Sequence, residues 1–256
     1  MFPAPCFVLG DAHVGAAPAD VEETLLALLE RARREAGSVV LNGDVFDFYF
    51  EWAHSVTRPS VRVLAAIARV VASGVPVLYI AGNHDCWGGD ILTKDVGATY
   101  VLGPWRGELA GWTTLIEHGD GLRGKADAPY RVLKAFVRHP IVTTLFSWLP
   151  PNFAVWLATR SSTTSRSARP KDGGKALYDV AQGRLAGDLG LDLYVFGHTH
   201  ARVVERTPSG GVLANPGAWL DEPSFLVVTP DAVELRRMSP NGPDETLTRF
   251  EKRTVV

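Results

Sequence analysis

The feature that most constrains the fold is an alternation of short apolar runs with amphipathic helical patterns along the first third of the chain. Apolar runs at 6–9, 38–41 and 75–80 are typical of buried strands. Between them, apolar residues recur at helical spacing over 20–36 and 59–73, and a glycine follows each stretch. Strands joined through helices pair in parallel, so this alternation predicts an α/β fold built around a parallel sheet.

The rest of the chain breaks this alternation. An insertion at 122–171 lacks the strand pattern, and its Ser/Thr-rich end at 161–167 predicts a loop or hinge. A helix is predicted at 174–186, followed by a strand at 191–196. Short β-branched runs then predict a second, largely antiparallel sheet. These runs lie at 202–207, 212–214 and 224–228.

Five short polar motifs each follow a predicted strand, at the end where α/β sheets place ligand sites. They are Asp11-Ala12-His13, Gly43-Asp44-Val45-Phe46-Asp47, Gly82-Asn83-His84-Asp85, His118-Gly119-Asp120 and Gly197-His198-Thr199-His200. Any one of them alone fits a turn or a helix cap. Burying so many polar groups unpaired would cost about 1–3 kcal/mol each, so together they predict a ligand. Carboxylate, imidazole and carboxamide donors without thiolate suit Mn, Fe or Zn ions.

In this order and spacing, the motifs resemble the calcineurin-like metallophosphoesterase superfamily over almost the whole chain. The resemblance implies a four-layer α/β/β/α sandwich and two divalent metal ions. It implies Asp11, His13 and His200 as ligands of the first ion, Asn83, His118 and His198 as ligands of the second, and Asp44 as the bridge between them. It also implies that His84 faces the leaving-group oxygen and that Asp47 orients His84.

The insertion concentrates positive charge beside the predicted site. Nine basic residues against the single acid Asp127 give it a charge of +8, and since the whole chain carries -2, the remainder carries -10. Aromatic and aliphatic residues lie between these charges, which favours a lipid-gripping cap over the alternative of a helical hairpin packed on the core. The concentrated positive charge predicts an anionic partner. The aliphatic content of 141–157 fits a nucleic-acid groove poorly, so no nucleic acid is expected.

A narrower resemblance rests on His118 to Leu122 and on residues of the insertion. These residues resemble the UDP-2,3-diacylglucosamine pyrophosphatases of lipid A synthesis, which release UMP and 2,3-diacylglucosamine 1-phosphate, with manganese. The resemblance places substrate-binding residues at Asp127, Tyr130, Arg131, Arg160 and Ser165. One position departs from the pattern, because the best-known branch has Arg where this chain has His84.

These observations predict a single domain over 1–256 with a cap at 122–171. The N-terminus lacks a signal-peptide pattern, and prolines interrupt the apolar stretch at 141–157. We therefore expect a cytoplasmic enzyme, bound peripherally at the inner face of the membrane through its nucleotide-linked lipid substrate. Two alternatives remain at this stage: a soluble phosphodiesterase or phosphomonoesterase acting on nucleotides or phosphoproteins, and a non-catalytic scaffold.

Overall fold

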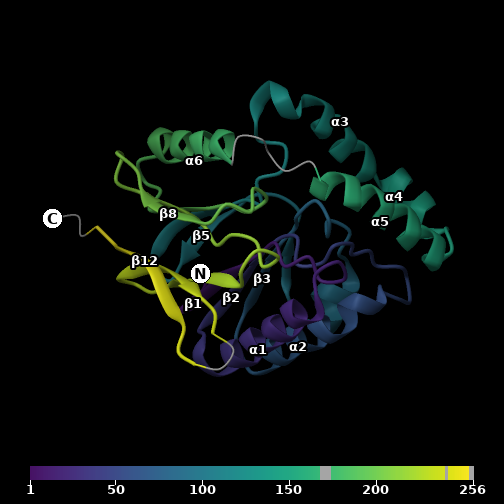
Figure 1. The fold of residues 1–256 in the computed structure, drawn as a ribbon, viewed down its shortest axis with the longest axis horizontal. Helices are drawn as coiled ribbons and strands as arrows, with labels where there is room; N and C mark the ends of the chain where they lie inside the picture. The colour runs from purple at the N-terminus through teal and green to yellow at the C-terminus, as the bar shows by residue number, and fades with distance from the viewer. Residues whose placement is uncertain (168–173, 240–241, 254–256) are drawn as a thin grey trace.

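Two sheets pack face to face, and helices cover both outer faces (Figure 1). The computed structural model describes residues 1–167, 174–239 and 242–253. The first sheet is seven-stranded, in the order β12-β11-β10-β1-β2-β3-β4. Its strands are β1 (Cys6–Leu9), β2 (Ser38–Asn42), β3 (Val77–Ile80), β4 (Thr99–Val101), β10 (Ser224–Val228), β11 (Ala232–Arg237) and β12 (Glu245–Glu251).

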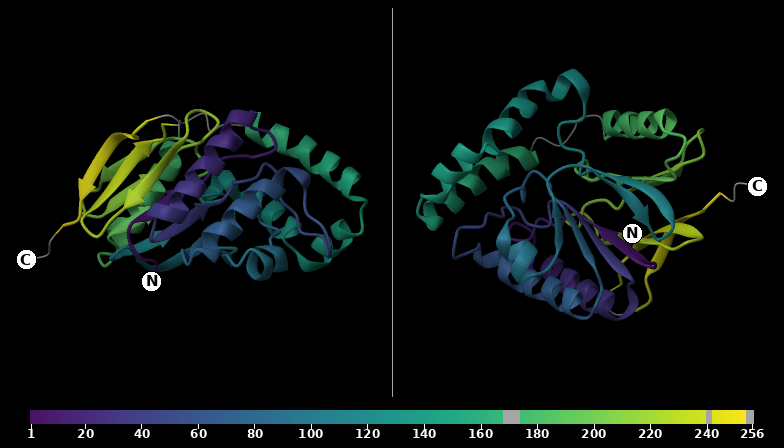
Figure 2. Two further views of the ribbon diagram at one scale, coloured as in Figure 1. Left: turned by 90° about the horizontal axis from the view of Figure 1, so that it is seen from below. Right: turned by 180° about the vertical axis from the view of Figure 1, so that it is seen from behind.

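The second sheet is five-stranded, in the order β5-β6-β7-β9-β8. Its strands are β5 (Trp105–Leu109), β6 (Trp112–Ile116), β7 (Leu193–Val195), β8 (Val203–Arg206) and β9 (Val212–Asn215). Helices α1 (Ala19–Glu35) and α2 (Val61–Ala72) lie on the first sheet, and α6 (Lys175–Gly187) lies on the second (Figure 2). The predicted four-layer sandwich is therefore confirmed.

Alternation along the central strands explains the layering, because successive side chains of a strand point to opposite faces. In β1, Phe7 and Leu9 pack under α1 and α2, whereas Cys6 and Val8 pack against the second sheet. Both sets are nearly fully buried, so the strand has no polar face. A strand buried on both faces reads as a continuous apolar run, which is the pattern seen in the sequence.

The predicted composition of the second sheet was partly wrong. Strand β10 belongs to the first sheet, where it pairs antiparallel with β1, and Cys6 lies opposite Val228. The second sheet is mixed, since β6, β7 and β9 run parallel while β5 and β8 are antiparallel to their neighbours. A run of apolar residues indicates a strand but not the strand with which it pairs. Strand β1, which pairs with β10, lies more than two hundred residues away in the chain.

Over residues 122–167 the cap is helical and lies to one side of the sandwich (Figure 1), whereas its last residues, 168–171, lie outside the described part of the chain. Its helices are the 3-10 turn η3 (Gly124–Asp127), α3 (Ala128–Val137), α4 (Pro140–Ser147) and α5 (Pro151–Ser167). The prediction of a loop at 161–167 was wrong, because α5 runs through it. Serine and threonine disfavour helix by only about half a kcal/mol per residue, too little to end a helix that is already formed.

The cap contacts the core through an aromatic cluster. Phe48 and Phe50, which follow β2, pack against Phe146 of α4 and Ala154 of α5. This contact holds one face of the cap on the loops that follow β2 and β3. In the described part of the chain, no helix combines the length and apolar character needed to cross a membrane.

Candidate metal centre

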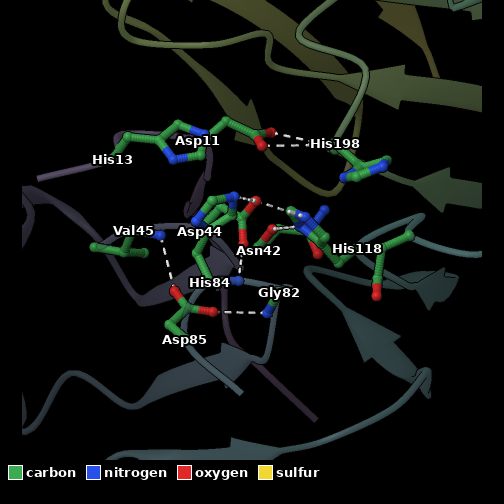
Figure 3. Close-up of polar contacts among 12 residues, drawn as sticks. Asp11, His13, Asn42, Asp44, Val45, Gly82, His84, Asp85, His118 and His198 are labelled. Atoms are coloured by element: carbon green, nitrogen blue, oxygen red, sulfur yellow. Dashed lines mark hydrogen bonds and ion pairs between the residues drawn. The ribbon is translucent and has the colours of Figure 1, made fainter. Parts of the chain in front are cut away.

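The loops after β1, β2, β3, β6 and β7 bring all five polar motifs to one place (Figure 3). Six of the seven predicted ligands fall into groups whose candidate ligand atoms lie within 4.8 Å of one another. These groups are Asp11 with His13 and His200, His13 with Asp44 and His84, and Asp44 with His118 and His198. The seventh, Asn83, lines the same cavity as His84.

The first group has the geometry of a cation site. The Nε2 atoms of His13 and His200 face each other at 3.3 Å, and Asp11 Oδ1 lies 3.6 Å from His200 Nε2. Burial lowers the pKa of His13 to about 3, so its ring is neutral and offers a lone pair at neutral pH. Burial also raises the pKa of Asp11 to about 7, and a bound cation would favour the charged carboxylate.

The second group is oriented by the backbone. His118 Nδ1 donates to the Asn42 carbonyl at 2.9 Å, which turns its Nε2 toward Asp44 Oδ2 at 3.2 Å. Fixing one ring nitrogen in this way is how proteins usually orient a ligating histidine. Burial lowers the pKa of His198 to about 4, so this imidazole too is neutral. The buried Oδ1 of Asn83 has no hydrogen-bond partner within the described residues.

Asp44 belongs to two of the three groups and is 2% exposed. Burial opposes its ionisation, but the imidazoles of His118 and His84 hold the pKa of its carboxyl well below the usual range. Burial alone would lower the pKa of His118, whereas the Asp44 carboxylate raises it well above its usual value. The Asp44 carboxylate thus favours the protonated, charged form of the His118 ring. A metal ion between the two side chains would take the place of that proton. The residues present therefore fit a pair of divalent ions.

The backbone at the site is held in an unusual conformation. Among the described residues, six that are not glycine have positive φ, and five of them are predicted metal ligands. These five are Asp11, His13, Asp44, His198 and His200, with φ between 47° and 65°. Such conformations are costly for residues with a Cβ atom and concentrate at functional sites.

Two glycines of the motifs make room for the ligand loops. A Cβ on Gly82 would lie 2.1 Å from Asp44 Oδ1, and one on Gly43 would lie 2.5 Å from His118 Nδ1. Gly43 also has a φ of +75°, which side chains rarely allow. These positions explain why glycine precedes the ligand in two of the motifs.

His84 lies beside the ligands with one ring nitrogen fixed. Its Nδ1 is 2.7 Å from the main-chain oxygen of Asp47, and because a carbonyl only accepts, Nδ1 carries the hydrogen. Its Nε2 lies 4.0 Å from Asp44 Oδ2, on the side of the ligand cluster. The carboxylate of Asp47 is farther from the ring, with Oδ1 at 3.8 Å from His84 Nδ1. The closest contact from Asp47 to His84 is thus made by its backbone.

Sequence reasoning missed the role of Asp85. This fully buried carboxylate accepts hydrogen bonds from the main-chain N–H of Val45, the main-chain N–H of Gly82 and the hydroxyl of Tyr79. It thereby joins the loop that carries Asp44 to the loop that carries Asn83. Its place in the third motif was visible in the sequence, but no pattern there reveals which main-chain groups it accepts from.

The predicted substrate residues all lie on the cap, in η3, α3 and α5. Tyr130 lines a cavity of about 180 Å³ together with His84 and Asn83. Asp127 accepts from Arg123, and Arg131 donates to the carbonyls of Gly121 and Gly124. Arg160 lies over the Trp156 ring. The side chain of Ser165 is outside the described residues.

Two polar residues for which the sequence predicted no role, Lys134 and Asp120, form an ion pair at this cavity. Lys134 lines its wall, and its Nζ lies 2.7 Å from Asp120 Oδ2. Asp120 is 5% exposed and directly follows the loop of His118. The helical spacing of Tyr130 and Lys134 is a signal that could have placed them on one face.

The chain is similar in sequence to known phosphoesterases. Residues 4–202 match the family model of the calcineurin-like phosphoesterases. The chain is 32% identical over 244 residues to the UDP-2,3-diacylglucosamine hydrolase of Porphyromonas gingivalis, covering 86% of this chain and 92% of that protein. It is 30% identical to the protein of the same name from Escherichia coli O7:K1, covering 89% and 96%. Among solved structures, Vacuolar Protein Sorting 29 of Cryptosporidium parvum is similar at 17% identity, with a TM-score of 0.48 over 98% of this chain and 100% of that one.

Fold and site together define a metal-dependent phosphoric ester hydrolase. The chain belongs to the calcineurin-like phosphoesterase family, whose members bind a dinuclear metal site.

Proposed function

We propose that this enzyme hydrolyses the diphosphate of UDP-2,3-diacylglucosamine. One water molecule is added across the P–O–P bridge, giving UMP and 2,3-diacylglucosamine 1-phosphate. The observation that carries the proposal is the cavity beside the ligand cluster. Its lining includes Asn83 and His84 together with apolar cap side chains such as Leu133 and Val137. The relatives from Porphyromonas gingivalis and Escherichia coli bear the name of this hydrolase.

We also propose how the ligands are shared. Asp11, His13 and His200 would hold one ion, and Asn83, His118 and His198 the other, with Asp44 between them. Two divalent ions, when bound, supply positive charge for the phosphate oxygens and lower the pKa of a water molecule. The nitrogen and oxygen donors fit Mn²⁺, with Fe or Zn as alternatives.

His84 is the residue we assign to the leaving group. The Asp47 carbonyl keeps the hydrogen on Nδ1, so Nε2 is the nitrogen available to the substrate. When protonated, Nε2 can donate a hydrogen bond or a proton to the oxygen on which charge develops. Asp47 in turn orients the ring, mainly through its main chain. Tyr130 remains a proposed substrate residue because it lines the cavity, and Asp127, Arg131, Arg160 and Ser165 remain predictions.

The proposed substrate is tested by direct hydrolysis. We expect the enzyme to release UMP from UDP-2,3-diacylglucosamine dispersed in detergent with Mn²⁺, followed by chromatography of UMP and the lipid product. The release should be faster than the cleavage of bis(p-nitrophenyl) phosphate, because only the lipid substrate uses the apolar wall of the cavity. If bis(p-nitrophenyl) phosphate is cleaved and the lipid is untouched, the enzyme is instead a soluble phosphodiesterase.

We further propose that the cap binds the cytoplasmic face of a membrane. The cap has an unusual number of exposed large apolar residues, whose exposed fractions lie between 44% and 76%. These are Val132, Leu133, Phe136, Ile141, Leu145, Trp148, Phe153, Trp156 and Leu157. So many exposed apolar side chains on one segment favour an interaction site, and the basic residues of the cap suit anionic lipid headgroups. A substrate with two acyl chains would reach the enzyme from such a surface.

Substitution of the cap surface tests this docking. We expect Ile141→Ser combined with Trp148→Ser to weaken cosedimentation with anionic phospholipid vesicles by about tenfold or more, because each side chain loses apolar contact with lipid. Both residues are well exposed, so the variant should fold normally. Leu189→Ser is the matched control, since Leu189 is 85% exposed but follows α6, away from the cap. Equal vesicle binding by both variants would contradict docking through the cap.

A further inference from the structure

Three polar side chains of the cap converge on one buried carboxylate. Tyr130, Lys134 and Arg138 are spaced four residues apart, so they share one face of α3 and its C-terminal end. The Tyr130 hydroxyl donates to Asp120 Oδ2 at 2.7 Å, and Lys134 Nζ lies 2.7 Å from the same oxygen. Arg138 Nη2 lies 4.0 Å from it. Asp120 therefore ties the cap to the loop of the candidate ligand His118.

The charges of this cluster do not balance. Asp120 is a single carboxylate facing two cations, and no other described carboxylate forms an ion pair with Lys134 or Arg138. Their side chains are only 27% and 19% exposed. Arg138 directs its guanidinium to the carbonyls of Leu102 and Gly82. Within the described residues, one of these two cations has no carboxylate of its own at ion-pair distance, and a partly buried cation in that situation favours a bound anion.

Lys134 is the cation that reaches the cavity. The cavity is lined by Lys134 together with Asn83 and His84, whereas Arg138 does not line it. An ammonium has three N–H groups. Two of them are accounted for by Asp120, at 2.7 Å to its Oδ2 and 3.2 Å to its main-chain oxygen. No other described residue accepts a hydrogen bond from this ammonium, so its third N–H is open to a ligand in the cavity, and the contact with Asp120 holds the ammonium in place.

We propose that Lys134 is a substrate-binding residue that takes the second phosphate of a diphosphate. The inference rests on the proposed function, in which one phosphate lies at the metal ligands. The neighbouring phosphate, one bridging oxygen away, then falls beside Asn83 and His84, where Lys134 stands on the cavity wall. A compact ammonium suits a phosphate oxygen whose direction changes as the bridge breaks, because it binds as a point charge. Lys134 thus favours diphosphates over substrates with one phosphate.

Binding of UDP and UMP separates this role from a structural one. With Mn²⁺ present, we expect Lys134→Ala to weaken UDP binding about tenfold by calorimetry while UMP binding stays unchanged, since only UDP has a second phosphate. Lys134→Arg, which keeps the charge, should restore part of the UDP affinity. Lys125→Ala is the matched control, because Lys125 is an exposed lysine of the cap outside the cavity, and it should leave both affinities unchanged.

Two results would overturn the proposal. Equal weakening of UDP and UMP by Lys134→Ala would assign Lys134 a structural role, and unchanged binding of both would remove it from the site. Neither readout depends on hydrolysis of the lipid. If UDP-2,3-diacylglucosamine is not cleaved but UDP affinity still depends on Lys134, the proposed lipid substrate fails while the diphosphate subsite stands.

Discussion

Asp44→Ala is expected to lower the rate of hydrolysis by about 10³-fold or more, because a shared ligand of two metal ions contributes several kcal/mol. The carboxylate contacts His118 on one side and accepts the main-chain N–H of His84 on the other. We expect its removal to lower the number of manganese ions bound per chain, measured by elemental analysis after dialysis. Both substrates, the lipid and bis(p-nitrophenyl) phosphate, should be affected alike.

Two controls separate metal loss from unfolding. Asp44→Asn keeps the shape and can still accept from the His84 N–H, so its thermal unfolding should resemble that of the parent while its metal content falls. Asp20→Ala removes an exposed carboxylate of α1 and should change neither the thermal unfolding nor the metal content. Full activity and full metal content in Asp44→Ala would refute the assignment of Asp44 as the bridge.

His84→Ala is expected to lower kcat for the lipid substrate by about 10²-fold, the usual effect of removing a group that stabilises charge on the leaving oxygen. We expect His84→Arg to stay within about tenfold of the parent, because a leaving phosphate needs positive charge more than a proton, and Arg supplies charge without giving up a proton. The cavity beside His84, of about 180 Å³, offers room for the longer side chain.

The pair of variants decides what His84 does. If His84→Arg is as inactive as His84→Ala, the leaving group requires a proton and not merely charge. His54→Ala provides the matched control, since His54 is an exposed histidine away from the ligand cluster and should leave kcat unchanged. Metal content should stay at the parent level in all three variants. A fall in the two His84 variants alone would show that His84 itself binds a metal ion.

Much of the fold and the convergence of the candidate ligands could be predicted because both depend on local patterns. Apolar runs such as 6–9 and 38–41 are buried on both faces, so they stand out without knowledge of their partners. Each candidate ligand follows the end of a strand, and the carboxyl ends of parallel strands meet at one edge. The convergence of Asp11 and Asp44 thus follows from the order of strands and motifs along the chain.

What the sequence could not reveal depends on contacts between distant segments. No local pattern predicts three of these contacts. They are the pairing of β10 with β1, the hydrogen bonds that Asp85 accepts from two loops, and the contacts of α3 with Asp120. The sequence by itself determined the parallel strands at the centre of the first sheet, the chemistry of the candidate ligands and the charge of the cap, because these follow from residue type and spacing. Only the tertiary structure decided that Lys134 stands beside Asn83 and His84, because the docking of the cap depends on packing against Phe48 and Phe50.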